Sequence, residues 1–171
     1  MNPRYYMISA ENWIDKMQLQ PHPEGGFYKE IYRSAESISS GLPDRFSGPR
    51  HFLTSIYFLL RSEDISTFHR IKSDELWYYH KGGSLSIYII EGDRLTVRCL
   101  GDDPERGEEL QVMVPANSWF GAKVDEEETY TLCSCAVAPG FDFTDFELAE
   151  RKTLLKTFPQ HQSIIELLTR E

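Results

Sequence analysis

Residues 68–82 read FHRIKSDELWYYHKG, and the pattern in this stretch decides the fold. Residues that favour β-structure fill two short runs, 65–71 and 75–80, with the polar segment Lys-Ser-Asp between them. Outward from it, runs of the same kind recur between turn signals rich in Gly and Asp, at 54–60, 85–90, 95–100, 110–114 and 130–138. This rhythm predicts an all-β sandwich or barrel of antiparallel strands.

The alternation of side chains along a strand predicts which residues of this stretch share a face. His69 and Ile71 lie on one side of the first strand, and Glu75, Trp77 and Tyr79 lie on one side of the second. We expect the two strands to form a hairpin. His69 and Glu75 would then meet inside the barrel.

Outside the predicted barrel the chain carries helical and irregular signals. Ser9 is a helix N-cap candidate for a short amphipathic helix, in which Trp13, Ile14 and Met17 fall at helical spacing. A strand is expected over 27–33, an exposed loop over 37–49, and helical or irregular closing elements over 146–157 and 163–169. The length predicts a single domain over residues 1–171.

Composition and charge restrict the function classes. The net charge of −9 would repel phosphate backbones and anionic lipid, and no basic cluster offsets it, so nucleic acid is not an expected partner. The apolar runs are too short to span a membrane, and no signal-type apolar segment is visible. Three cysteines, Cys99, Cys133 and Cys135, form no CxxC pair and are expected as reduced thiols. The expected location is the cytoplasm.

The stretch that opened the argument resembles the first motif of the cupin superfamily. His69, Glu75 and Gly82 fall on three of its four motif positions, whereas Ile71 occupies the position of the second histidine. The second motif, a proline, a glycine and a histidine, falls on Pro115, Asn117 and Phe120, of which only the proline matches.

The resemblance implies a metal site that this chain has largely lost. The usual cupin metal is held by three His and one Glu, a set suited to divalent iron, manganese, nickel or zinc. Here His69 and Glu75 are the two metal-ligand candidates that remain, and two protein ligands seldom bind a metal tightly. We therefore expect no obligatory metal or other cofactor.

Four segments are also similar to a narrower group of short single-domain cupins of unassigned function, cupin family 5. They are residues 21–34 (PHPEGGFYKEIYRS), 68–77 (FHRIKSDELW), 111–119 (QVMVPANSW) and 137–148 (VAPGFDFTDFEL). The resemblance implies a double-stranded β-helix, the cupin jelly-roll barrel, and a homodimer. It implies no particular reaction.

The candidate site residues follow from the predicted interior face and from the resemblance. The catalytic candidates are His69, Glu75 and Tyr79, and the ligand-binding candidates are Glu30, Trp77, Gln111, Trp119 and Phe120. Metal-free sugar epimerases of the cupin fold offer an analogy, in which His69 would be the base and Tyr79 the acid.

Other interpretations of the same residues remain open. The rings of Trp77, Tyr79, Trp119 and Phe120 would serve a barrel core as well as a pocket wall. His69 and Glu75 could be a buried structural pair, and the adjacent glycines in 22–26 favour a tight turn over a ligand-gripping loop.

Three function hypotheses therefore stand. The first is a metal-independent epimerase or isomerase that acts on a carbohydrate-like or other small polar metabolite. The second is a non-catalytic dimeric module that binds a metabolite. The third is a metal-dependent enzyme that recruits ligands from outside the motif.

Overall fold

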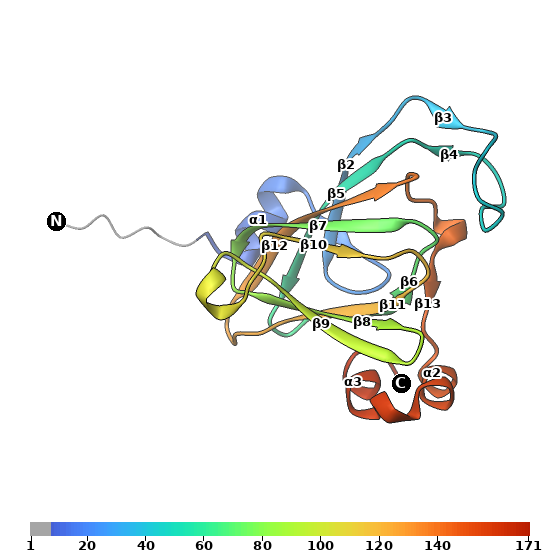
Figure 1. The fold of residues 1–171 in the computed structure, drawn as a ribbon. Coiled ribbons are helices and arrows are strands. Elements are labelled where there is room, and N and C mark those ends of the chain that lie inside the picture. The colour runs from blue at the N-terminus through green and yellow to red at the C-terminus, as the bar shows by residue number, and fades with distance from the viewer. Residues whose placement is uncertain (1–7) are drawn as a thin grey trace.

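Two antiparallel sheets face each other and form a barrel in the computed structural model, which describes residues 8–171 (Figure 1). The elements in chain order are α1 (Ala10–Met17), β1 (Gln20–Pro21), β2 (Phe27–Arg33), β3 (Ser37–Ile38), β4 (Arg50–His51), β5 (Thr54–Arg61), β6 (Ile65–Arg70), β7 (Asp74–Gly82), β8 (Leu85–Glu91), β9 (Arg94–Leu100), η1 (Pro104–Arg106), β10 (Gln111–Val114), β11 (Trp119–Val124), β12 (Tyr130–Ala138), η2 (Phe143–Asp145), β13 (Glu147–Leu148), α2 (Arg151–Thr157), η3 (Pro159–His161) and α3 (Gln162–Leu167). The predicted all-β barrel is confirmed.

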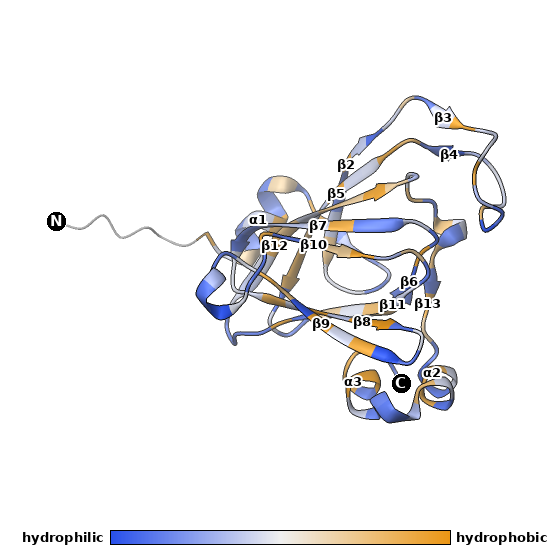
Figure 2. Cartoon of the chain, viewed as in Figure 1, coloured by the Kyte–Doolittle hydropathy of each residue, from blue (hydrophilic) through white to orange (hydrophobic). Residues whose placement is uncertain are grey.

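The strand order shows how the barrel closes. One sheet runs β1-β2-β5-β12-β7-β10 and the other runs β13-β6-β11-β8-β9. The short strands β3 and β4 pair with each other in an arm that extends from one end of the barrel (Figure 1). In Figure 2 the hydropathy changes repeatedly along the barrel strands, as expected where one side of each strand faces the interior.

The hairpin expected between residues 65–71 and 75–80 is wrong. β6 pairs with β11 and β13, whereas β7 pairs with β12 and β10, so the chain passes from one sheet to the other between them. A strand pairs with its sequence neighbour only where the turn keeps both in one sheet, and here residues 71–73 form a corner between sheets instead. His69 and Glu75 consequently come from opposite sheets.

Strand β11 has no counterpart among the expected runs. Its sequence, WFGAKV, contains Gly and Ala and shows no clear alternation of polar and apolar residues. Four of its six residues are buried because it lies in the middle of the five-stranded sheet, with β6 on one side and β8 on the other. A strand covered on both faces loses the period-two signal.

The helices at both ends cover the barrel, as the sequence indicated. Ser9 caps α1 by accepting a hydrogen bond from the Asn12 backbone N–H at 3.3 Å, and the helix packs on Leu59 and Leu132 of the six-stranded sheet. The helices α2 and α3 pack beside the five-stranded sheet through a second apolar cluster that includes Phe68. No helix in the described part of the chain is long and apolar enough to cross a membrane.

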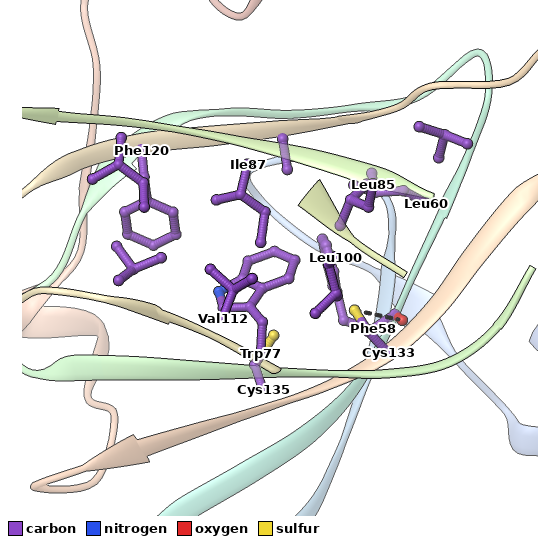
Figure 3. Packing of buried hydrophobic residues seen from close by; sticks show 14 of the residues in the cluster. Phe58, Leu60, Trp77, Leu85, Ile87, Leu100, Val112, Phe120, Cys133 and Cys135 are labelled. Carbon is purple, nitrogen blue, oxygen red and sulfur yellow. Dashed lines mark hydrogen bonds between the residues drawn. The ribbon is translucent and has the colours of Figure 1, made fainter. Parts of the chain in front are cut away.

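One half of the barrel interior is filled by large side chains. Trp77, Leu85, Ile87, Leu100 and Val112 are almost completely buried and point toward one another between the sheets (Figure 3). We call this region the packed half. Its boundary layer contains the rings of Phe58 and Phe120, whose centroids lie 5.6 Å and 6.4 Å from that of Trp77. Beyond these rings the interior is hollow.

Candidate functional site

The hollow half of the barrel is a cavity of about 280 Å³ that opens to solvent. Its lining includes three sets of side chains. The inner group consists of His22, Glu24, His69 and Glu75. The aromatic wall consists of Tyr28, Phe58, Phe141, Phe143 and Phe146, and the outer pair consists of Glu30 and Arg33. The inner group is buried and the outer pair is partly exposed, so the acid–base groups lie deepest.

Two glycines bring Glu24 to the base of the cavity. Gly25 has φ +117°, and a Cβ atom there would lie 2.0 Å from the carbonyl oxygen of Ile65. Only glycine permits this close approach of the loop to β6. The approach lets Ser66 donate a hydrogen bond to Glu24 Oε1 at 2.8 Å. The interpretation of residues 22–26 as a tight turn missed that the turn also supplies two site residues, His22 and Glu24.

Glu24 and His69 lie in contact at the base of the cavity. The Nδ1 atom of His69 lies 2.7 Å from the carbonyl oxygen of Thr67, which can only accept, so Nδ1 carries a hydrogen. Its Nε2 atom lies 3.0 Å from Glu24 Oε2. A proton on the carboxyl or on the imidazole relieves the repulsion between the lone pairs of these two atoms. We call these two residues the Glu24–His69 pair.

Burial decides where that proton resides. Desolvation lowers the pKa of His69 to about 4. The same cause raises the pKa of Glu24, although His22 and the hydrogen bond from Ser66 lower it in part. Both shifts favour the neutral forms. Burial therefore favours the proton on the carboxyl of Glu24 over the proton on the imidazole of His69.

His22 supports the pair from the side of the turn. Its Nδ1 atom accepts a hydrogen bond from the backbone N–H of Glu24 at 3.3 Å and lies 3.4 Å from Glu24 Oε2. Burial lowers the pKa of His22 as well, with the carboxyl of Glu24 opposing the shift. The ring centroid lies 4.5 Å from that of Tyr28. His22 thus connects the inner group to the aromatic wall.

Glu75 faces the same cavity from the other sheet. Its side chain comes from β7, with 8% of the residue exposed. Burial first, and then the electrostatic interaction with Glu24, raise its pKa to about 8, and a hydrogen bond with the thiol of Cys135 opposes both effects. Glu75 is therefore mostly protonated at neutral pH. The expectation that His69 and Glu75 share one cavity is correct, although they reach it from facing sheets.

The wall segment between β12 and β13 is held in place by an ion pair behind it. Arg50 donates to both carboxylate oxygens of Asp145 at 2.6 Å, and both side chains are buried. At the opening, Arg33 donates to the carbonyl oxygen of Phe141 at 3.1 Å. Residues 141–146 are therefore tied to both β2 and β4. This fixes the three phenylalanines of the wall.

The structure does not bring all of the predicted site residues to the cavity. Glu30 lines it together with His69 and Glu75, but Tyr79 donates its hydroxyl to the carbonyl oxygen of Gly82 at 2.5 Å and lies outside the lining. Trp77 fills the packed half, since alternate residues of β7 face the same interior at successive depths. An acid role for Tyr79 and a ligand contact for Trp77 therefore lose their geometric basis.

Three further ligand-binding candidates also lie elsewhere. Gln111 is exposed on the edge strand β10. Trp119 faces the opposite side of its sheet and lies under the guanidinium of Arg70 at 4.6 Å. Phe120 is 1% exposed in the boundary layer, where its ring centroid lies 4.1 Å from that of His69. Phe120 shapes the site from behind His69 and does not line the cavity.

The residues present do not fit the usual cupin metal. Ile71 and Phe120 offer no ligand atoms at two of the expected positions. The Nδ1 atom of His69 is hydrogen-bonded to Thr67, and its Nε2 atom already faces Glu24. Within residues 8–171 no group of three or more His, Cys, Asp or Glu side chains is arranged to hold a metal ion. Asn117 adopts the left-handed conformation, with φ 64°, at the position where the motif has glycine.

Comparison with known proteins identifies relatives along nearly the whole chain. Residues 11–149 match the family described as Cupin superfamily (DUF985). A hypothetical protein from Leishmania major is 38% identical, with a TM-score of 0.88 over 95% of this chain and 99% of that one. A protein from Shewanella oneidensis is 41% identical, with a TM-score of 0.86 over 96% and 99%.

A curated relative extends the comparison to yeast. An uncharacterized protein of Saccharomyces cerevisiae is 27% identical over 169 residues, which cover 93% of this chain and 84% of that protein. The Leishmania protein is described as hypothetical and the yeast protein as uncharacterized, and the Shewanella protein is described by its source alone. None of these descriptions assigns an activity.

Proposed function

This chain belongs to the cupin superfamily, in the DUF985 family, and from that premise we propose that it binds a small metabolite in the hollow half of the barrel and supports metal-independent proton transfer there. The reaction class would be that of an epimerase or isomerase. The observation that carries the proposal is the inner group, in which the Glu24–His69 pair and a protonated Glu75 line one cavity.

The chemistry follows from the protonation states of these groups. An epimerase or isomerase takes a proton from a carbon next to a carbonyl and returns one. The Glu24–His69 pair can give its proton to the carbonyl oxygen of the guest, and the carboxylate so formed on Glu24 can take one from the neighbouring carbon. The reverse steps return a proton to that carbon. Glu75 lies on the facing sheet and can contact the polar end of the same guest. The walls of apolar rings keep water from the reacting atoms.

A second candidate function is a non-catalytic binding module. The observation that favours it is that His69 is 2% exposed, with Nδ1 hydrogen-bonded to Thr67 and Nε2 in contact with Glu24. In such a module the pair would only shape and neutralise the base of the cavity. The expected homodimer is compatible with either candidate.

Native mass spectrometry of the purified chain, followed by a proton-exchange assay, tests the proposal. A small molecule that co-purifies should be incubated with the protein in deuterium oxide and followed by proton NMR. We expect deuterium to enter at one carbon position, and both Glu24→Gln and His69→Asn to slow its entry about a hundredfold or more while binding persists.

The contrary results are equally specific. Binding without any exchange supports the non-catalytic module, whereas the lack of any retained or added ligand contradicts both candidates. As a matched control, Glu147→Gln removes an exposed carboxylate that pairs with Arg70 outside the cavity. It should leave the exchange rate unchanged.

A further inference from the structure

Carboxyl side chains outnumber basic side chains in the lining of the cavity. Three carboxyl side chains, Glu24, Glu30 and Glu75, line it, and Arg33 is the only Lys or Arg among the described lining residues. Arg33 is already engaged, since it donates to the two carboxylate oxygens of Glu30 at 3.0 Å and 2.7 Å and to the carbonyl oxygen of Phe141. The outer pair is therefore neutral in sum. The lining offers Glu75 no cation.

The carboxyl of Glu75 has hydrogen-bonding capacity to spare. All but 8% of the residue is buried, and the hydrogen bond to its carboxyl comes from the thiol of Cys135, a poor donor. The groups that face it are that thiol from β12, Glu24 from the turn and His69 from β6. A buried carboxyl with so poor a partner costs free energy that a guest with N–H donors would recover.

Aromatic rings surround the space in front of Glu75. Phe58 lies at the base and Phe143, which is 53% exposed, lies at the opening. Between them the centroids of Phe141 and Phe146 are 6.3 Å apart, and that of Tyr28 lies beside His22. The faces of aromatic rings carry negative potential and attract cations at distances of about 6 Å. A positively charged guest would lie among aromatic rings along the cavity.

We propose that the cavity takes a compact organic cation, a protonated amine or amidine on a small flat apolar body, whose binding displaces the proton of Glu75 to solvent and leaves the carboxylate to pair with the cation between aromatic rings. The proposal rests on the proposed function, since it names the class of molecule that the same cavity would bind. A carbohydrate is a poorer fit, because its hydroxyls need polar partners on all sides and the walls are rings. An anion would find no free cation among the described residues of the lining, because Arg33 is already paired with Glu30.

Three isosteric probes distinguish these classes: benzamidine, benzamide and benzoate share one shape and differ in charge. Their affinities for the purified full chain should be measured at neutral pH by calorimetry or by NMR titration. We expect benzamidine to bind about tenfold or more tighter than benzamide, which corresponds to one charge-assisted hydrogen bond and a cation–π contact. Benzoate should bind weakest.

Variants locate the charge recognition. Glu75→Gln keeps the shape and cannot ionise when a cation binds, so the preference for benzamidine over benzamide should fall to about onefold while the affinity for benzamide persists. Glu63→Gln removes a carboxylate whose side chain is 62% exposed outside this cavity, and it should keep the full preference. A loss with both variants would mean that net charge alone attracts the cation, which contradicts the proposal.

Phe143→Leu tests the aromatic contribution at a half-exposed position that folding does not depend on. It should reduce benzamidine affinity by about threefold and leave benzamide nearly unaffected. Equal or tighter binding of benzamide or benzoate overturns the cation assignment but leaves a small-molecule site. No binding of any probe at millimolar concentration also overturns it. The proposed function falls only if, in addition, no molecule co-purifies or binds.

Discussion

The two halves of the barrel interior are built from the same strands but have opposite properties. β7 contributes Trp77 to the packed half and Glu75 to the cavity, two residues apart on one face. In the packed half, volume is filled and polar groups are few. In the hollow half, the inner group, the outer pair and the five aromatic residues of the wall surround open space. The packed half stabilises the fold, and this stability offsets the free-energy cost of the polar groups buried in the hollow half.

The packed half should show the largest loss of stability when it is truncated. Trp77→Ala would leave a void among Val112, Phe58 and Phe120, and we expect the free energy of unfolding to fall by about 3–5 kcal/mol. Denaturant unfolding followed by circular dichroism measures this loss. A loss below about 1 kcal/mol would mean that this half is loosely packed and that the contrast between the halves is wrong.

The hollow half should show a pH dependence that the packed half does not. The pKa of Glu75 is about 8 in the folded chain and 4.5 when exposed, so between these values the folded chain holds a proton that the unfolded chain has lost. The free energy of unfolding therefore falls as the pH rises from 4.5 to 8. The pKa of His69 shifts from 6.5 to about 4, which removes stability as the pH falls through that range. The two effects oppose each other between about 4.5 and 6.5.

Glu75→Gln isolates the first effect. Relative to the unchanged chain, the variant should gain stability by about 1.4 kcal/mol for each pH unit between 4.5 and 8, because the amide never ionises. Unfolding curves at pH 6, 7 and 8 are sufficient. A constant difference across these pH values would contradict a buried, protonated Glu75.

The smallest effect on stability is expected at the opening. Phe143 is half exposed, so Phe143→Leu should change the free energy of unfolding by about 0.5 kcal/mol or less, even though it weakens cation binding. Thermal unfolding of Phe143→Leu and of Trp77→Ala under the same conditions compares the stability loss at the opening with that in the packed half. A large loss would show that the aromatic wall is part of the structural core.

The comparison also explains what the sequence could predict. Turn signals and alternation located the strands that have one polar side, such as 27–33 and 130–138, and Ser9 marked the start of α1. Strand β11 was missed because both of its faces are covered. The alternation on β7 correctly put Glu75 and Trp77 on one interior face. It does not indicate how far along the barrel axis each residue lies. It could not tell the cavity from the packed half.

The site was predictable where the motif residues remain and not where distant segments meet. His69 and Glu75 could be named from their spacing. Glu24 and His22 reach the site through a turn that is 42 residues from Ser66 in the chain, a contact that no local pattern encodes. Tyr79 was chosen by analogy, but its hydroxyl bonds the backbone of Gly82 instead. Local sequence patterns determine which face of a strand a residue lies on. The corner at which the chain crosses from one sheet to the other determines which residues of the two sheets come together.

The central claim is that a buried, protonated carboxyl of Glu75 faces an open cavity. A carbon NMR titration of the glutamate carboxyl resonances tests it most directly, with the spectrum of Glu75→Gln identifying the signal. We predict a titration midpoint near pH 8 for Glu75. A midpoint near 4.5, the value of an exposed glutamate, would contradict the account.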